Sequence, residues 1–163
     1  AYGVGYSSFT FQVQDNGGTA NGGVNEDASP NTITFDVLNV NDAPAGTNNT
    51  VTVLEDSVLS FVAGDFGFTD PNDTPANNLL GVVMTTIPAL GTLSLAAGAS
   101  APGPVTAGQF VSAADLSFLR YTPPANANGT GYASFTFQVR DDGGTANGGQ
   151  NTDQTANTMT IDV

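Results

Sequence analysis

The sequence predicts an all-β fold, namely an antiparallel Greek-key β-sandwich of seven or eight strands that is repeated in tandem. Apolar and polar residues alternate with a period of two in several short segments, which is typical of half-buried strands. Clusters of Gly, Pro, Asn and Asp, which favour turns, separate these segments. A sandwich fits this spacing of strands and turns better than the alternative, a barrel.

The third observation is a repeat within the chain. Gly5–Val37 recurs 126 residues later as Gly131–Val163, without a gap and with 23 of 33 positions identical. A self-match at a fixed distance is typical of an array of one structural unit. We therefore expect residues 1–40 to be the C-terminal hairpin of a preceding repeat, residues 41–44 to be a linker, and residues 45–163 to be a complete repeat.

The composition excludes several kinds of chemistry. The chain has no Cys and no His, and therefore lacks disulfides, thiol nucleophiles and the commonest general base. Fifteen acidic residues face only two arginines, which gives a net charge of −13. Such a chain cannot neutralise phosphates, and it would be repelled by an anionic membrane. No apolar run is long enough to cross a bilayer. This acidity favours surroundings rich in divalent cations or salt.

The first expected element is a long hairpin. Its strands should cover residues 6–15 and 32–40, where apolar and polar side chains alternate. The loop between them is rich in Gly, Asn and Asp and is typical of a polar connection. Pro44 cannot donate a hydrogen bond to a strand, so the hairpin should end before it.

The complete repeat should follow as a series of short strands. They are expected at Val51–Leu54, Val58–Val62, Leu79–Ile87, Gly91–Leu95, Leu116–Thr122, Tyr132–Asp141 and Asn157–Val163. Residues 96–108 are rich in Gly and Pro and should lack regular structure. Ser112 is expected to cap one helical turn over residues 112–115.

The expected core consists of the larger apolar residues of these segments. They are Val53, Leu59, Phe61, Phe68, Leu80, Val82, Met84, Leu93, Leu95, Phe110, Leu116, Leu119, Tyr121, Phe135, Phe137, Val139, Met159, Ile161 and Val163.

Acidic and amide residues gather at the ends of the predicted strands. They are Asn41 and Asp42, Glu55 and Asp56, Asp70, Asn72 and Asp73, and Asp141 and Asp142. Calcium takes six to eight oxygen ligands in irregular geometry, so several acidic loops that meet at one end of a sandwich could form a Ca²⁺ site. The alternative is that these residues only form turns, for which Asp and Asn are common.

Several stretches resemble a known family. Phe137–Gly144, Thr158–Val163 and Phe35–Pro44 resemble the end of a cadherin-like repeat and its linker. Tyr121–Gly129, followed by Tyr132–Phe137, is similar to a signature of bacterial cadherin-like and Ig-like repeats. Such repeats form giant surface adhesins of the RTX type, which are often exported by type I secretion.

The resemblance implies Ca²⁺ between neighbouring repeats. It assigns Asn41, Asp42, Asp70, Asp73 and Asp141 to the junction with the preceding repeat, Glu55 and Asp56 to the junction with the following repeat, and Asp15 to the place of Asp141 in the preceding repeat. The spacing of Asp70 and Asp73 is one residue longer than in the family. The Asp-Arg-Glu segment of true cadherins is missing, so one or two ions per junction are expected.

The resemblance further implies a non-catalytic, extracellular and cell-surface module, a stalk or extender of an adhesin that is rigidified by Ca²⁺, with neighbouring repeats as partners. One alternative is a filament in which residues 1–40 pair with other copies by β-strand complementation. Another is a carbohydrate-binding adhesive domain, although the chain has no Trp and only four Tyr as sugar platforms. The long loops 17–31 and 143–157 could bind an ion or a partner, or could simply connect strands. A glycosidase-like enzyme is the weakest alternative, because the carboxylate pairs are sequence neighbours.

Overall fold

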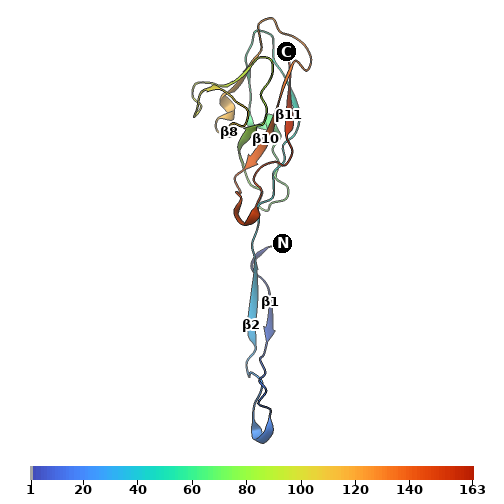
Figure 1. The fold of residues 1–163 in the computed structure, drawn as a ribbon, viewed down its shortest axis with the longest axis vertical. Helices are drawn as coiled ribbons and strands as arrows, with labels where there is room; N and C mark the ends of the chain where they lie inside the picture. The colour runs from blue at the N-terminus through green and yellow to red at the C-terminus, as the bar shows by residue number, and fades with distance from the viewer. Residues whose placement is uncertain (1) are drawn as a thin grey trace. The chain divides into compact units, whose positions relative to one another are not determined.

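The computed structural model describes residues 2–163 and divides the chain into two compact units. The first unit extends to Asn39 and is a two-stranded hairpin (Figure 1). The second unit, Val40–Val163, is a sandwich of two sheets. The segment predicted to be a linker belongs to this second unit, where Ala45 and Thr69 exchange backbone hydrogen bonds of 2.9 and 2.8 Å.

The hairpin unit consists of β1 (Gly3–Phe11) and β2 (Asn31–Val37), which pair antiparallel with Phe9 opposite Ile33. Its long loop contains a 3-10 helix, η1 (Ala20–Gly22). This loop reverses direction at Asn21-Gly22, where both residues have positive φ angles of 55° and 83°. Asn and Gly tolerate this conformation better than other residues do.

The sandwich of the second unit has one sheet of five strands and one of four. In spatial order, the first sheet contains β3 (Asn49–Thr52), β11 (Asn157–Asp162), β10 (Ala133–Asp141), β5 (Leu79–Met84) and β8 (Phe110–Ser112). The second contains β4 (Leu59–Ser60), β9 (Leu119–Thr122), β6 (Thr92–Leu95) and β7 (Gly103–Pro104). The 3-10 helices η2 (Ala63–Phe66), η3 (Leu116–Phe118) and η4 (Ala146–Gly148) lie in the connections. The predicted β-sandwich is confirmed.

One pairing in this sheet differs from the antiparallel expectation. β3 runs parallel to β11, with Val51 opposite Ile161. The chain crosses from one sheet to the other between β3 and β4, so β3 cannot pair with its neighbour in sequence. It adds instead to the free edge of the last strand.

None of the helices described for residues 2–163 is long and apolar enough to cross a membrane.

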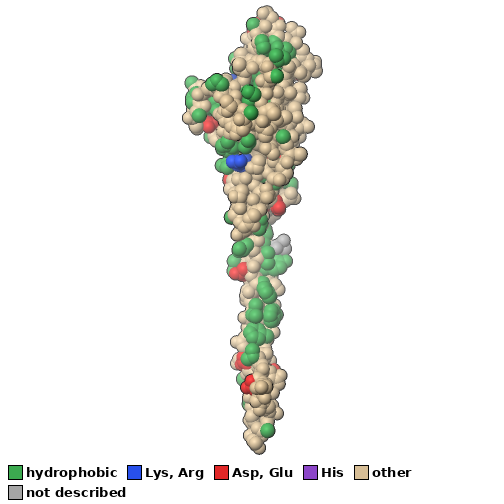
Figure 2. Space-filling model, in the orientation of Figure 1, with side chains coloured by type: hydrophobic (Ala, Val, Ile, Leu, Met, Phe, Trp, Pro, Cys, Tyr) green, Lys and Arg blue, Asp and Glu red, His purple; other side chains and the backbone are tan. Residues whose placement is uncertain are grey.

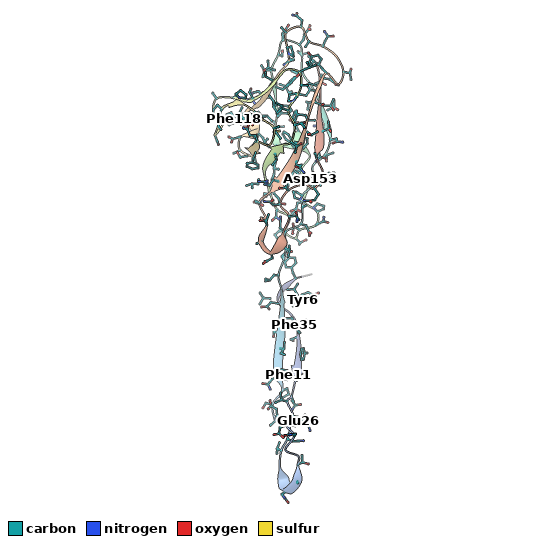
Figure 3. The ribbon with its side chains drawn as sticks, viewed as in Figure 1. Tyr6, Phe11, Glu26, Phe35, Phe118 and Asp153 are labelled. Atoms are coloured by element: carbon teal, nitrogen blue, oxygen red, sulfur yellow. The ribbon has the colours of Figure 1, made fainter. Side chains whose placement is uncertain are left out.

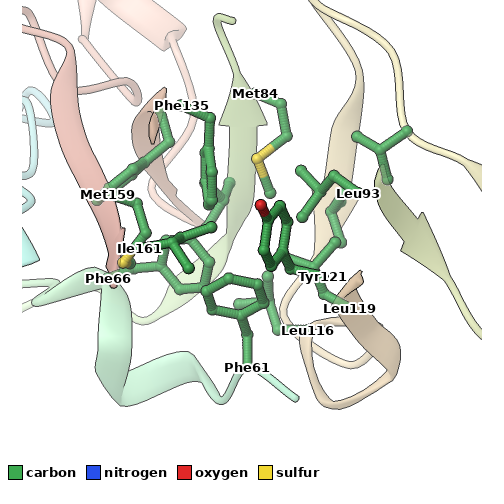
Figure 4. Packing of buried hydrophobic residues seen from close by; sticks show 14 of the residues in the cluster. Phe61, Phe66, Met84, Leu93, Leu116, Leu119, Tyr121, Phe135, Met159 and Ile161 are labelled. Carbon is green, nitrogen blue, oxygen red and sulfur yellow. The ribbon is translucent and has the colours of Figure 1, made fainter. Parts of the chain in front are cut away.

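In the core, aromatic rings pack between β10 of the first sheet and the segment that follows β4 (Figure 4). The rings of Phe61 and Phe135 meet edge to face at 5.7 Å, and those of Phe66 and Phe137 do so at 4.9 Å. Edge-to-face packing adds to the stabilisation that comes from burying the rings. The buried hydroxyl of Tyr121 donates a 3.1 Å hydrogen bond to the carbonyl of Leu90.

The core prediction was wrong for Leu80 and Phe110, which are 43% and 39% exposed. A β-bulge explains Leu80, because Arg140 pairs with Gly81 while the next residue, Asp141, pairs with Leu79. The extra residue interrupts the alternation of side chains along the strand. Phe110 lies on the outer side, where its ring centroid is 5.3 Å from the guanidinium carbon of Arg140.

The core prediction also missed Phe66, Val105 and Val111, which are buried. Phe66 lies in a 3-10 helix, where side chains do not alternate between two faces, so a period-two pattern cannot predict its burial. The expected turn over residues 112–115 is present, because the backbone N–H of Asp115 donates to the carbonyl of Ser112 at 2.9 Å and to its Oγ at 3.2 Å, and the 3-10 helix η3 follows it. The segment expected to lack structure contains the short strand β7, which pairs with β6.

Candidate metal site

Five of the predicted site residues lie at one end of the sandwich. Because β5 and β10 are antiparallel neighbours, the loop that precedes β5 lies beside the residue that ends β10. This arrangement brings Asp70 and Asp73 close to Asp141. Asn41 and Asp42 join them from the start of the unit, where the backbone N–H of Asp42 donates a 2.9 Å hydrogen bond to Oδ2 of Asp73.

The amide group of Asn41 occupies a point on which several oxygen atoms converge. Its Nδ2 lies 3.1 and 3.3 Å from the two carboxylate oxygens of Asp141, 3.2 Å from the carbonyl of Gly144 and 2.6 Å from that of Gln150. An amide nitrogen has only two hydrogens and cannot serve four acceptors fully. The backbone N–H of Gln150 donates to the carbonyl of Asn41 at 2.9 Å and holds the two segments together.

The carboxylate of Asp70 is only half satisfied. Asp70 is 7% exposed, and its Oδ2 accepts a 2.6 Å hydrogen bond from the backbone N–H of Asn77. Its Oδ1 is buried and has no hydrogen-bond partner. An unpaired polar atom costs free energy when it is removed from water, and a charged one costs more.

Burial raises the pKa of Asp141 above its ordinary value of 3.8, and repulsion from Asp70 and Asp73 adds to this effect. Hydrogen bonds from the N–H of Gly143 and the amide of Asn41 act in the opposite direction. The arginines are engaged elsewhere: Arg140 donates to Thr152 at 3.1 Å, and Arg120 donates to backbone carbonyls. The site is therefore a concentration of negative charge in a buried place.

The neighbouring Asp142 has a different environment. It is exposed, and its carboxylate accepts hydrogen bonds of 2.8 and 3.3 Å from the backbone and side chain of Asn78. These bonds, the backbone one first, lower the pKa of Asp142. Asp142 therefore ties the loop before β5 to the end of β10.

The carboxylates do not form a metal site by themselves. Among residues 2–163, no three or more His, Cys, Asp or Glu side chains are grouped so that they could hold a metal ion. The oxygens at this end are of mixed type: carboxylates, the amide of Asn41 and the carbonyls of Gly144 and Gln150. Such a mixture is characteristic of Ca²⁺, which accepts carbonyl and amide oxygens as well as carboxylates.

The other predicted site residues lie elsewhere. Glu55 and Asp56 are exposed and follow β3, which runs parallel to β11, so they lie at the opposite end of the sandwich. Oδ1 of Asp56 accepts a 3.1 Å hydrogen bond from the backbone of Asn126. In the hairpin unit, Asp15 accepts a 2.7 Å bond from the N–H of Gly17, the same turn contact that Asp141 makes with Gly143 at 2.9 Å.

Two asparagines at this end were missed by the sequence analysis. Asn77 donates to Asp70, to Oδ2 of Asp73 at 3.3 Å and to the amide oxygen of Asn41, and Asn78 binds Asp142. Their position directly before the strand Leu79–Met84 is the signal that could have identified them. The carbonyls of Gly144 and Gln150 carry no signal in sequence, because every residue has one.

The buried carboxylate of the long loop, Asp153, stabilises the fold (Figure 3). It accepts hydrogen bonds from the N–H of Gly46 at 2.8 Å, from the N–H of Thr155 at 2.9 Å and from the amide of Asn157 at 2.6 Å. Asp27 makes equivalent bonds within the hairpin unit. These contacts account for both oxygens of Asp153.

Replacing Gly143 by alanine should disrupt this end of the sandwich. A Cβ atom there would overlap the amide groups of Asn41 and Asn77. We expect a loss of about 1–3 kcal/mol in the free energy of unfolding, as for other overpacked sites, measured by urea denaturation. Gly17 is the matched control, because a Cβ there would meet only Asp15, at 3.1 Å. If both substitutions lowered the free energy of unfolding equally, the close packing of Gly143 against Asn41 and Asn77 would be contradicted.

The two-sheet architecture defines the class of this chain as an all-β sandwich module of the immunoglobulin-like kind. Residues 41–155 match the family model described as Bacterial Ig domain, which is more than half of the chain, and the chain therefore belongs to this family. The predicted resemblance to bacterial Ig-like repeats is confirmed. Neither the comparison with curated proteins nor that with solved structures found a match. Family membership indicates an extracellular repeat module of a family that is generally non-enzymatic.

Proposed function

We propose that this chain is a stalk or extender module of a bacterial surface adhesin, and that its acidic end binds Ca²⁺. The observation that carries the proposal is the buried Oδ1 of Asp70, which has no hydrogen-bond partner. This atom lies near the carboxylates of Asp73 and Asp141, which repel one another and Asp70. A divalent cation would satisfy this atom and remove the repulsion among the three groups.

The ligands would come from three segments. Asp70 and Asp73 come from the loop before β5, and Asp141 comes from the end of β10. Asn41 would contribute its amide oxygen after rotation of the amide plane, which exchanges Oδ1 and Nδ2. The amide of Asn77, which donates to Oδ1 of Asn41, would rotate with it. The carbonyls of Gly144 and Gln150, which lie 3.2 and 2.6 Å from Nδ2 of Asn41, would complete a set of six to eight oxygens together with water.

Such a site would stiffen the segment that leads into the sandwich. Asn41 and Asp42 precede β3, and an ion that held them against Asp73 and Asp141 would restrict their backbone. The bacterial Ig family and the acidic composition support a role outside the cell, where calcium is abundant. At cytosolic calcium the chain would remain less stable and exportable, and external calcium would stabilise the folded form by mass action.

Calcium should raise the thermal midpoint of the unit Val40–Val163. At a concentration 100 times the dissociation constant, one bound ion contributes about 2.7 kcal/mol, or roughly 10 °C for a unit of this size. The measurement is calorimetric melting in chelator and in several millimolar CaCl₂. Magnesium at the same concentration is the control, because Mg²⁺ requires regular octahedral geometry and should shift the midpoint less. A midpoint that is the same in chelator and in calcium would refute the site.

The carbohydrate-binding alternative has less support. A surface hollow lies beside β3 and β11 and is lined by Asn48, Asn49, Thr50, Thr158 and Thr160. These side chains offer hydrogen bonds to a sugar, but the lining contains no aromatic ring on which one could stack.

A further inference from the structure

The chain contains the same hairpin twice in nearly identical form. Phe9 lies opposite Ile33 in the first copy, and Phe135 lies opposite Met159 in the second. The turn contacts repeat as well: Gly5 donates to Asp36 at 2.7 Å, and Gly131 donates to Asp162 at 2.6 Å. The register of the hairpin and these turn contacts are therefore the same in both surroundings, although β1 ends at Phe11 whereas β10 continues to Asp141.

The two copies differ in what covers them. Phe9 is 49% exposed, whereas its counterpart Phe135 is 1% exposed. The same contrast holds for three further pairs, in which the first residue is exposed and the second is buried: Val13 and Val139, Ile33 and Met159, Phe35 and Ile161. Figure 2 shows these apolar side chains as a continuous stripe along β1 and β2. A two-stranded hairpin with such a face is only marginally stable alone.

The stripe carries no charge that would oppose an apolar partner. The carboxylates of Asp27 and Asp36 accept hydrogen bonds from turns of the hairpin itself. Asp15 is likewise bound to the N–H of Gly17. The hairpin therefore offers an apolar face together with two unpaired strand edges, because within residues 2–163 β1 and β2 pair only with each other.

We propose that this face docks the body of another repeat of the same sequence, namely a copy of the segment Leu38–Thr130 joined ahead of Gly5. The second unit shows the partner that this hairpin sequence selects. There β10 pairs with β5, β11 pairs with β3, and the rings of Phe135 and Phe137 meet Phe61 and Phe66. The inference does not rest on calcium, because Asp141, whose backbone pairs with Leu79, is the only proposed metal ligand that takes part in these contacts.

The 126-residue offset predicts each contact of the docked hairpin. Residues 11–15, which end β1 and follow it, would pair antiparallel with the partner's counterpart of β5, with Val13 in the place where Val139 faces Val82. β2 would pair parallel with the counterpart of β3, with Phe35 in the place where Ile161 faces Val51. Phe35 is larger than Ile161, so it would be tightly packed against a partner of this sequence.

The test replaces residues 1–4 by a copy of Leu38–Thr130 placed directly before Gly5, and this extended chain is measured in chelator and in calcium. We expect amide hydrogen exchange of β1 and β2 to slow by at least about 100-fold relative to the unextended chain, because these strands join a cooperative unit. Phe9→Ala in the extended chain should lower the melting midpoint of the added unit by about 10 °C or more. The unit Val40–Val163 melts separately and serves as an internal reference.

Two further variants control the result. Thr34→Ala should shift the midpoint by less than about 2 °C, because its counterpart Thr160 lies between the inward-facing Met159 and Ile161 and so faces outward. Phe35→Ile should raise the melting midpoint of the added unit, because it relieves the overpacking of Phe35 against the docked partner. A hairpin that is not docked has no such overpacking to relieve. Hairpin amides that exchange equally fast in both chains overturn the proposal. So does an unextended chain that protects its hairpin by dimerisation, since a second copy would then be the occupant.

Discussion

Replacing Phe135 by alanine should lower the free energy of unfolding of the unit Val40–Val163 by about 3–5 kcal/mol. Phe135 is almost fully buried, and its ring packs edge to face against Phe61, which directly follows β4 of the opposite sheet. The substitution would remove this contact and leave a cavity between the sheets, which the surrounding strands can fill only partly. Urea denaturation followed by tyrosine fluorescence measures the loss.

Phe9 is the matched control, because it occupies the same position in the first copy of the hairpin. In the unextended chain its side chain is half exposed, and its ring lies beside those of Phe11 and Phe35. Phe9→Ala should therefore change the stability of the unit Val40–Val163 by no more than about 0.5 kcal/mol. If both substitutions destabilised this unit to the same extent, the division of the chain into two units would be wrong.

Replacing Asp141 by asparagine should abolish the calcium response. Asp141 is the most deeply buried of the three carboxylates, and asparagine keeps an oxygen that can accept the N–H of Gly143 but carries no charge. The expected loss is the whole stabilisation by calcium, about 2.7 kcal/mol at 100 times the dissociation constant. Melting in chelator and in calcium measures it. Asp15→Asn, the matching change in the hairpin unit, should leave the response intact.

Asp141→Asn should also alter the way in which the stability of the unit Val40–Val163 depends on pH in chelator. Because the folded state raises the pKa of Asp141, it binds this proton more tightly than the unfolded state does. The calcium-free unit should therefore lose stability as the pH rises from 3.8 through the raised pKa, and Asp141→Asn should remove that loss. Asp142 and Asp115 have lowered pKa values, so their contributions are lost only as the pH falls below 3.8. A wild-type profile that matches that of the variant above this pH would contradict the assignment.

Local patterns predicted most of the strands and half of the candidate site. Alternating side chains located β10 and β11, and the acidic residues at strand ends included Asp70, Asp73 and Asp141. The patterns could not predict that Asn77 lies among them, because asparagine before a strand is also an ordinary turn residue. Backbone carbonyls are equally invisible in sequence.

Other features depend on pairing between distant segments. Leu80 is turned out of the core by a bulge opposite Arg140 and Asp141, about 60 residues away along the chain. Phe66 enters the core from a 3-10 helix, which lies outside the alternation of any strand. The parallel pairing of β3 with β11 follows from the crossing of the chain between sheets.

The repeated hairpin shows which features the local sequence determines and which depend on tertiary structure. Its register, its turns and the bonds that its aspartates make to residues of the hairpin itself are the same in both copies, so the sequence alone determines them through short-range hydrogen bonds and backbone preferences. Burial is different: Phe9 and Phe135 share a local sequence, yet only Phe135 lies in a core. Tertiary structure decides this difference, because burial depends on whether a second sheet and residues such as Phe61 are present to cover the apolar face.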